Sequence, residues 1–138
     1  MDAGFDIAGL LPVEATLDGA LGFELIKLEP GFVSAKFAVA DKHKQPFGLV
    51  HGGVYAALSE SLASMGTYLG VRSDDKIAMG MSNFTQFLRP VTEGNVFAEA
   101  TAEHRGRTTW LWNVRLTDDA GRACALSRVT IAVRDRPA

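Results

Sequence analysis

Hydrophobic and polar positions along the chain predict a short helix and a β-hairpin at its start. Residues 22–29 and 32–40 alternate between apolar and polar side chains, and Pro30 and Gly31 between them are typical of a turn. Residues 13–21 separate their polar and apolar positions at helical spacing. We therefore expect a short helix followed by two paired strands.

Residues 53–70 predict one long helix that is apolar on most sides and therefore buried. Gly70 is typical of a helix C-terminus. One stripe of this helix carries large apolar side chains, and a second carries small side chains with one carboxylate. The first stripe comprises Val54, Leu58, Leu62, Met65 and Leu69, and the second comprises Ala56, Ala57, Glu60, Ala63, Ser64 and Thr67.

The rest of the chain alternates as four strands separated by turns, over residues 77–89, 95–104, 108–117 and 122–133. Two strands, a buried helix and a four-stranded meander predict an α+β fold, in which one curved antiparallel sheet wraps around the central helix. We expect a single domain over residues 1–138. Because such a sheet covers the helix on one side only, we expect a homodimer to cover the rest.

Composition and charge narrow the choice of partners. The net charge of -2 leaves no basic excess for a phosphate backbone, so we expect no nucleic-acid partner. The longest apolar stretch contains Glu60 and is too short for a membrane span, so we expect no membrane partner. No Lys or Arg precedes Lys27, unlike in a signal peptide, and one cysteine fits a reducing compartment. We therefore expect a cytoplasmic protein.

The loop before the long helix carries a distinctive motif. It reads QPFGLVHGG from Gln45 to Gly53, and Glu60 follows Gly52 by eight residues. Together with residues 87–90 (Phe-Leu-Arg-Pro), this motif resembles the hotdog-fold acyl-CoA thioesterases, in particular the 4-hydroxybenzoyl-CoA and phenylacetate-degradation type. The resemblance extends over about residues 20–134. It implies hydrolysis of an aryl- or medium-chain acyl-CoA to a free acid and CoA, with no cofactor.

The resemblance also implies roles for the motif residues. Glu60 would act as nucleophile or as general base, the Gly52 amide would polarise the thioester carbonyl, and Gln45 would assist. Elementary chemistry agrees, because amides at a helix N-terminus favour developing negative charge and a carboxylate in an apolar helix needs a task or a partner. Close members of the family often carry His where this chain has Phe87, which leaves the acyl group open.

Other members of the motif allow more than one interpretation. Ser64 lies one turn after Glu60 and could donate to its carboxylate, or could simply be a small packing residue. His51 could be a base, although we favour a role in fixing the loop. The Gln45 amide could equally brace the loop, and Glu60 could be a buried carboxylate paired across a dimer.

The spacing of Gly52 and Glu60 predicts how the subunits combine. Eight helical residues span about 12 Å, which is too far for both groups to reach one carbonyl. We therefore expect Gln45, His51 and Gly52 of one subunit to meet Glu60 and Ser64 of another. The resemblance further implies that such dimers pair into homotetramers.

A CoA ester also needs groups that hold its nucleotide phosphates, for which arginine is well suited. The resemblance points to two segments and to Gly80, with Arg128 as a further candidate. The candidates are Gly53, Gly80, Phe87, Leu88, Arg89, Pro90, His104, Arg105, Gly106, Arg107, Thr108, Thr109 and Arg128. Arg105 and Arg107 could also be ordinary turn charges.

Remaining residues of chemical interest receive structural interpretations. We expect His43 and His104 to face solvent without holding a metal. Cys124 is interpreted as a strand residue, and Trp110 and Trp112 as core or interface residues. Two other functions stay open: an acyl-CoA-binding module without turnover, and a hotdog dehydratase or hydratase, which resembles a different pattern with paired Asp and His.

Overall fold

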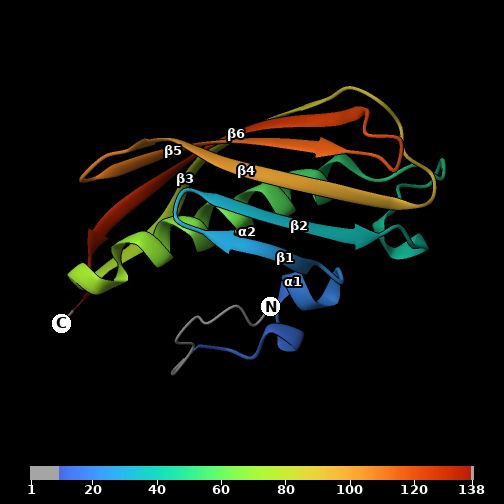
Figure 1. The fold of residues 1–138 in the computed structure, drawn as a ribbon. Helices are drawn as coiled ribbons and strands as arrows, with labels where there is room; N and C mark the ends of the chain where they lie inside the picture. The colour runs from blue at the N-terminus through green and yellow to red at the C-terminus, as the bar shows by residue number, and fades with distance from the viewer. Residues whose placement is uncertain (1–9, 138) are drawn as a thin grey trace.

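One long helix lies against a curved antiparallel sheet, as the sequence pattern predicts (Figure 1). The structure is a computed structural model that describes residues 10–137. The helices are α1 (Leu17–Ala20) and α2 (Gly52–Val71), with short 3-10 turns η1 (Val13–Ala15), η2 (Asp41–His43) and η3 (Arg72–Asp74). The strands are β1 (Glu24–Glu29), β2 (Phe32–Ala38), β3 (Lys76–Phe87), β4 (Asn95–Arg105), β5 (Thr109–Thr117) and β6 (Ala123–Asp135).

The order of strands differs from the predicted meander. The sheet runs β1-β2-β4-β5-β6-β3, so β3 lies at one edge and pairs with β6 rather than with β4. The prediction of a continuous four-stranded meander is therefore wrong. Strand β4 pairs instead with β2, in register from Phe32 opposite Thr101 to Ala38 opposite Asn95. The first hairpin thus occupies the position beside β4 that β3 would take in a meander.

The segment before β1 is also broken into shorter pieces than predicted. Thr16 has an extended backbone (φ −110°, ψ 173°) and separates η1 from α1. Its hydroxyl donates a hydrogen bond to the Val13 carbonyl (2.6 Å). Threonine hydroxyls compete with helical hydrogen bonds in this way, which explains why one continuous helix over residues 13–21 does not form.

Helix and sheet pack closely because small residues face tryptophan. A Cβ built on Gly66 would lie 2.4 Å from the Trp112 ring, and one on Gly70 would lie 2.5 Å from the Trp110 ring. The Trp112 indole N–H donates to the Thr67 hydroxyl (2.8 Å), which satisfies a buried polar pair. Both tryptophans are buried, in agreement with their predicted core or interface role.

The division of α2 into two stripes needs one correction. Ala63 and Thr67 were predicted on the stripe of small side chains that carries Glu60 and that the sheet leaves uncovered. Both are instead fully buried against the sheet. The buried face is centred on Leu58, Leu62 and Gly66, where small neighbours let the indole rings approach. Glu60 remains on the open side of the helix.

His43 is a second correction, because it is buried rather than facing solvent (1% exposed). Its Nδ1 accepts from the Ala40 amide (2.9 Å), and its Nε2 donates to the Leu21 carbonyl (2.6 Å). The ring also lies 4.6 Å from the Phe37 ring, measured between centroids. The loop after β2 folds back onto the first hairpin, so it offers the imidazole partners for both nitrogens. His104 is exposed, as predicted.

Candidate active site

His51 builds the junction between the motif loop and α2. Its Nδ1 accepts a hydrogen bond from the Gly53 amide (2.8 Å) and so caps the helix N-terminus. Its backbone amide donates to the His43 carbonyl (2.8 Å). These contacts agree with a loop-fixing role, and they leave Gly52 at the first helical position, where amides have no intrahelical partner.

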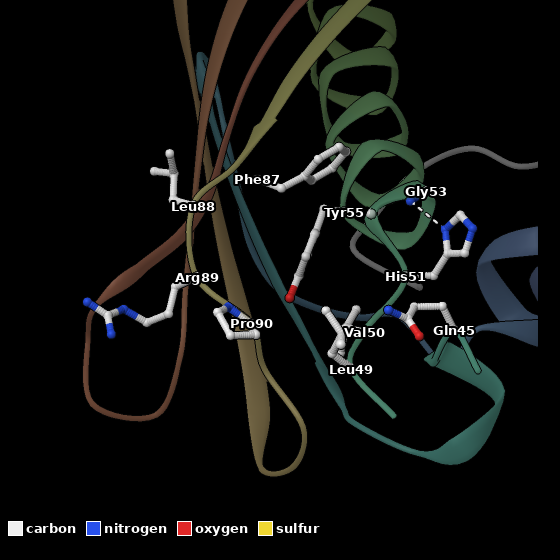
Figure 2. A pocket seen from close by; sticks show the side chains of 11 residues that line it. Gln45, Leu49, Val50, His51, Gly53, Tyr55, Phe87, Leu88, Arg89 and Pro90 are labelled. Carbon is white, nitrogen blue, oxygen red and sulfur yellow. Dashed lines mark hydrogen bonds between the residues drawn. The ribbon is translucent and has the colours of Figure 1, made fainter. Parts of the chain in front are cut away.

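A pocket of about 670 Å³ opens beside this junction (Figure 2). Gly52 lies directly against Phe87, since a Cβ on Gly52 would be 2.6 Å from the Phe87 ring. The Tyr55 ring lies 6.4 Å from the same ring and forms the inner wall. A side chain at position 52 would have to displace the exposed Phe87 ring, so glycine lets the two segments approach closely, and Gly52 lines a cavity with mostly apolar walls.

The Gln45 side chain stabilises its own loop through its amide oxygen. The side-chain oxygen accepts from the Phe47 amide, and the Gln45 backbone amide donates to the Leu49 carbonyl (2.9 Å). In Figure 2 the side-chain nitrogen lies on the side of Val50 and Tyr55. The residue can brace the loop with its oxygen and still offer N–H donors toward the pocket.

Glu60 and Ser64 line a different pocket, of about 520 Å³. The Glu60 side chain is exposed and faces Gly80, where a built Cβ would lie 3.3 Å from the carboxyl carbon. Nearby, the Asn83 side chain donates to the Ala56 carbonyl (2.9 Å) and ties β3 to the helix turn that carries Glu60. Within residues 10–137, neither a hydrogen bond nor an ion pair engages the Glu60 carboxylate.

The two parts of the predicted site do not meet within one chain. The pocket at Gly52 and the pocket at Glu60 have no lining residue in common. This separation follows from the eight-residue spacing along α2, which places the two groups about 12 Å apart along its axis.

The predicted CoA-binding residues fall into separate groups. Residues 87–90 line the Gly52 pocket, where the Leu88 and Arg89 side chains point away from His51 (Figure 2). Residues 104–109 form the β4–β5 turn at the other end of the sheet, where the Thr108 carbonyl accepts from the Val133 amide (2.9 Å). The structure therefore does not bring all the candidates together in one chain.

Two of the candidate arginines have partners of their own. The Arg105 guanidinium lies 5.6 Å from the Trp110 ring centroid, and Arg128 forms an ion pair with Glu103 (3.0 Å). Gly106 is crowded by its own turn, because a Cβ there would lie 2.7 Å from the His104 ring. These contacts are compatible with the alternative interpretation of Arg105 as a turn charge.

Several residues of the Glu60 pocket were not predicted from the sequence. They come from the N-terminal segment and from the end of β6, namely Leu10, Leu11, Val13, Asp18 and Arg136. The adjacent leucines before Pro12 indicated a contact surface, because neighbouring apolar side chains outside a helix or strand are typical of residues that pack against a ligand or another segment. Nothing in the local pattern indicated which pocket they would line.

Burial changes the pKa values of two groups beneath the Gly52 pocket. Tyr55 and Cys124 lie beside each other in the core, and both are buried. Burial raises the pKa of the Tyr55 hydroxyl and the pKa of the Cys124 thiol above their ordinary values. The thiol is therefore held in its protonated form, which argues against Cys124 as a nucleophile.

The described part of the chain holds neither a metal-binding cluster nor a membrane-spanning helix. No group of three or more His, Cys, Asp or Glu side chains there is arranged to hold a metal ion. Likewise, none of the helices between residues 10 and 137 combines the length and the apolar character needed to cross a bilayer.

Comparison with known proteins links this geometry to one family. The family model described as the thioesterase superfamily matches residues 47–125, which include the Gly52 junction and Glu60. The chain is 37% identical to a proofreading thioesterase, EntH, of Cronobacter turicensis, covering 86% of this chain and 85% of that one. It is 34% identical to a 1,4-dihydroxy-2-naphthoyl-CoA hydrolase of Listeria monocytogenes, covering 87% and 97% respectively.

The fold has close counterparts among solved structures. A thioesterase of Pseudomonas aeruginosa, PA1618, superposes with a TM-score of 0.84 at 35% identity, over 88% of this chain and 87% of that chain. A thioesterase of Haemophilus influenzae superposes with the same TM-score at 30% identity, over 89% and 85%. The predicted hotdog architecture is therefore confirmed.

Proposed function

This chain belongs to the thioesterase superfamily, and from that premise we propose that it hydrolyses acyl-CoA thioesters to a free acid and CoA. The observation that carries the proposal is the Glu60 carboxylate, which is exposed in a pocket. It forms no ion pair with any cation among the described residues. A carboxylate held on a helix beside a cavity can serve as base or nucleophile toward a bound ester. The acyl group is proposed to be aryl or medium-chain.

The complete site is proposed to form between two subunits. Gly52 of one subunit would hold the thioester oxygen through its amide, and Glu60 of the other would act on the carbonyl carbon. The 12 Å axial spacing supports this division, because one chain cannot present both groups to the same carbonyl. Gln45 would add a donor on the Gly52 side, and Ser64 a hydroxyl on the Glu60 side.

The free edge of β3 is the proposed dimer contact. Among residues 10–137, this strand of twelve residues pairs on one side only, with β6. Large apolar side chains along it are strongly exposed, including Met79 (50%), Met81 (58%) and Phe84 (67%). A long apolar edge strand is a template for strand association unless it is covered. Dimers built in this way are proposed to pair into tetramers.

The proposed reaction needs no cofactor, because water is the second substrate. With Glu60 as general base, its carboxylate takes a proton from water while the water oxygen attacks the thioester carbonyl. The C–S bond then breaks, and the CoA thiolate takes up the proton. With Glu60 as nucleophile, its carboxylate attacks the thioester carbonyl, the C–S bond breaks and the CoA thiolate leaves with a proton from solvent. Water then hydrolyses the resulting anhydride to the free acid and regenerates the Glu60 carboxylate. In both routes the Gly52 amide stabilises the oxyanion.

Replacement of Glu60 tests the proposal. Glu60→Gln removes the charge at nearly constant size, so kcat for thiol release should fall at least about 10²–10³-fold while the circular dichroism spectrum stays unchanged. Glu99→Gln is the matched control, because Glu99 is exposed on β4 and lines neither pocket. An unchanged kcat in Glu60→Gln would overturn the mechanism.

Thiol release, measured together with acyl-CoA binding and enoyl-CoA hydration, separates the rival functions. Saturable binding of acyl-CoA without thiol release would identify a binding module. Hydration of an enoyl-CoA without thiol release would identify a hydratase.

A further inference from the structure

The pocket at Glu60 has a wall that the proposed mechanism does not use. Leu10, Leu11 and Val13 line it from the N-terminal side, opposite Met65 of α2 and Ile77 of β3. Nothing in the loop-helix motif involves this segment.

The segment is held in place by specific contacts. The Ser61 hydroxyl donates to the Asp18 carboxylate (2.6 Å), which ties the segment to α2 one residue after Glu60. At Gly19 there is no room for a side chain, since a Cβ would lie 2.3 Å from the Val13 carbonyl oxygen. The segment therefore folds back tightly on α1 and presents a defined wall to the pocket.

Its leucines are incompletely covered by the rest of the described chain. Leu10 is 58% exposed and Leu11 is 73% exposed, although both line the pocket. Exposed apolar surface at a cavity mouth is stabilised when an apolar ligand covers it. The facing residues Met65, Ile77 and Ala78 are also apolar, so an acyl group would be enclosed by hydrocarbon on both sides.

The pocket also has a defined length along the helix. It extends from Glu60 past Ser64 to Tyr68, two turns further on, which is about 12 Å along the axis. An extended chain advances about 1.2 Å per bond, so this distance corresponds to roughly ten bonds. At the Tyr68 end the Arg136 guanidinium donates to the Tyr68 hydroxyl (3.5 Å), so the lining there is polar.

We propose that Leu10, Leu11, Val13 and Asp18 form the wall of the acyl-binding pocket and determine which acyl groups the enzyme accepts. The inference rests on the proposed function, because it assigns the occupant of the Glu60 pocket as the acyl group of the thioester. The substrate class is an apolar chain of up to about ten bonds, or a ring of equivalent length. Each methylene buried there should raise kcat/KM about fourfold until the chain reaches Tyr68.

The test compares kcat/KM across saturated acyl-CoAs from acetyl to tetradecanoyl, with benzoyl-CoA as the ring substrate. Leu11→Ala removes apolar wall at an exposed position and should lower the octanoyl-to-acetyl ratio of kcat/KM about tenfold. Leu17→Ala is the matched control, because Leu17 is an exposed leucine of the same segment (60%) that does not line the pocket. Its ratio should equal that of the wild type.

Two more variants complete the test: one fills the pocket, and the other frees the N-terminal segment from α2. Val13→Trp should move the optimum toward shorter acyl groups, and Asp18→Ala, which breaks the contact to Ser61, should flatten the chain-length profile. Profiles of Leu11→Ala, Val13→Trp and Asp18→Ala that all match the wild type would overturn the inference. Absence of thiol release from every acyl-CoA in the wild type would instead overturn the proposed function, so the two failures are distinguishable.

Discussion

At the scale of single residues, His51 shows how a side chain in a catalytic motif can act through structure. Its Nδ1 is occupied by the Gly53 amide, which makes it the cap of α2. A ring nitrogen that accepts a backbone N–H is not available on that side as a proton acceptor. The geometry thus supports the interpretation of His51 as a positioning residue for Gly52.

Substitution of His51 separates the two roles. Asparagine can also cap a helix, so His51→Asn should keep the wild-type stability and a kcat within a few-fold, whereas His51→Ala should lose about 1 kcal/mol of unfolding free energy. Urea denaturation and thiol-release kinetics provide both measurements. A stable His51→Asn variant with kcat reduced a hundredfold would show that the imidazole acts as a base.

Cys124 leads to a pH-dependent prediction. Burial raises the pKa of its thiol in the folded protein, so the folded state keeps the proton after the unfolded thiol, with a pKa of about 8.5, has lost it. The stability that this burial contributes is complete below pH ~8.5 and is lost as the pH rises toward the folded value. The expected loss is about 1.4 kcal/mol per pH unit.

Urea unfolding of the wild type and of Cys124→Ala at pH values from 7 to 9.5 measures this effect. The slope above pH ~8.5 should disappear in Cys124→Ala, which has no thiol to ionise. Equal slopes in the two proteins would contradict the assignment. Below pH ~8 the thiol is protonated in both the folded and the unfolded wild type, so ionisation of Cys124 should cause no difference in slope between the two proteins.

At the scale of elements, the contact between α2 and β5 decides how close the helix lies to the sheet. Gly66 has space only for a hydrogen, because Trp112 and Val33 would lie 2.4 and 2.9 Å from a Cβ. Helix propensity favours Ala over Gly by about 1 kcal/mol, whereas overpacking costs about 1–3 kcal/mol. The packing cost outweighs the propensity gain at this position.

Gly66→Ala should therefore destabilise the protein by up to about 2 kcal/mol, in spite of the better helix former. Urea denaturation measures the change. The double variant Gly66→Ala/Val33→Ala should be destabilised by less than the sum of the two single variants, because Val33→Ala removes one of the crowded contacts. Unchanged or increased stability in Gly66→Ala would show that helix and sheet can separate without cost.

At the scale of the whole molecule, the single chain holds two separate pockets that share no lining residue. The Gly52 pocket contains donors, and the Glu60 pocket contains the carboxylate. The exposed edge of β3 offers the surface through which two chains could combine them. Activity should therefore depend on association, and each subunit should contribute a different part of every site.

Phe84→Lys should weaken dimerisation, because it places a charge on the apolar edge of β3, and thiol release should fall with the dimer fraction. Ile26→Lys is the matched control, since Ile26 is an exposed apolar residue (55%) of β1 at the opposite edge of the sheet. Light scattering after gel filtration measures the oligomeric state. A monomer with full activity would contradict the shared site.

Mixing two inactive variants tests the sharing directly. Gln45→Ala and Glu60→Gln impair different parts of the site, so a mixed dimer contains one intact site and one doubly impaired site. Random exchange should restore about a quarter of the wild-type sites. No recovery after confirmed subunit exchange would show that both parts act within one chain.

The sequence by itself determined the elements and the motif. Alternation over β1, β2 and β4–β6 was read correctly because each strand exposes one face, and α2 was recognised because its apolar run is long. The predicted stop at Gly70 is wrong, because the helix continues to Val71. The spacing of Gly52 and Glu60 on one helix already required them to lie apart. These features depend on local geometry, which neighbouring residues set.

Only the tertiary structure decided what depends on long-range pairing. It placed β3 at the edge beside β6, buried His43 between Ala40 and Leu21, and turned Ala63 toward the sheet. It also brought Leu10, Leu11, Val13 and Asp18 to the wall of the Glu60 pocket. Local patterns specify whether a residue is suited to a strand, helix or turn, but the partner of an edge, a ring nitrogen or an exposed leucine is chosen by packing across the whole chain.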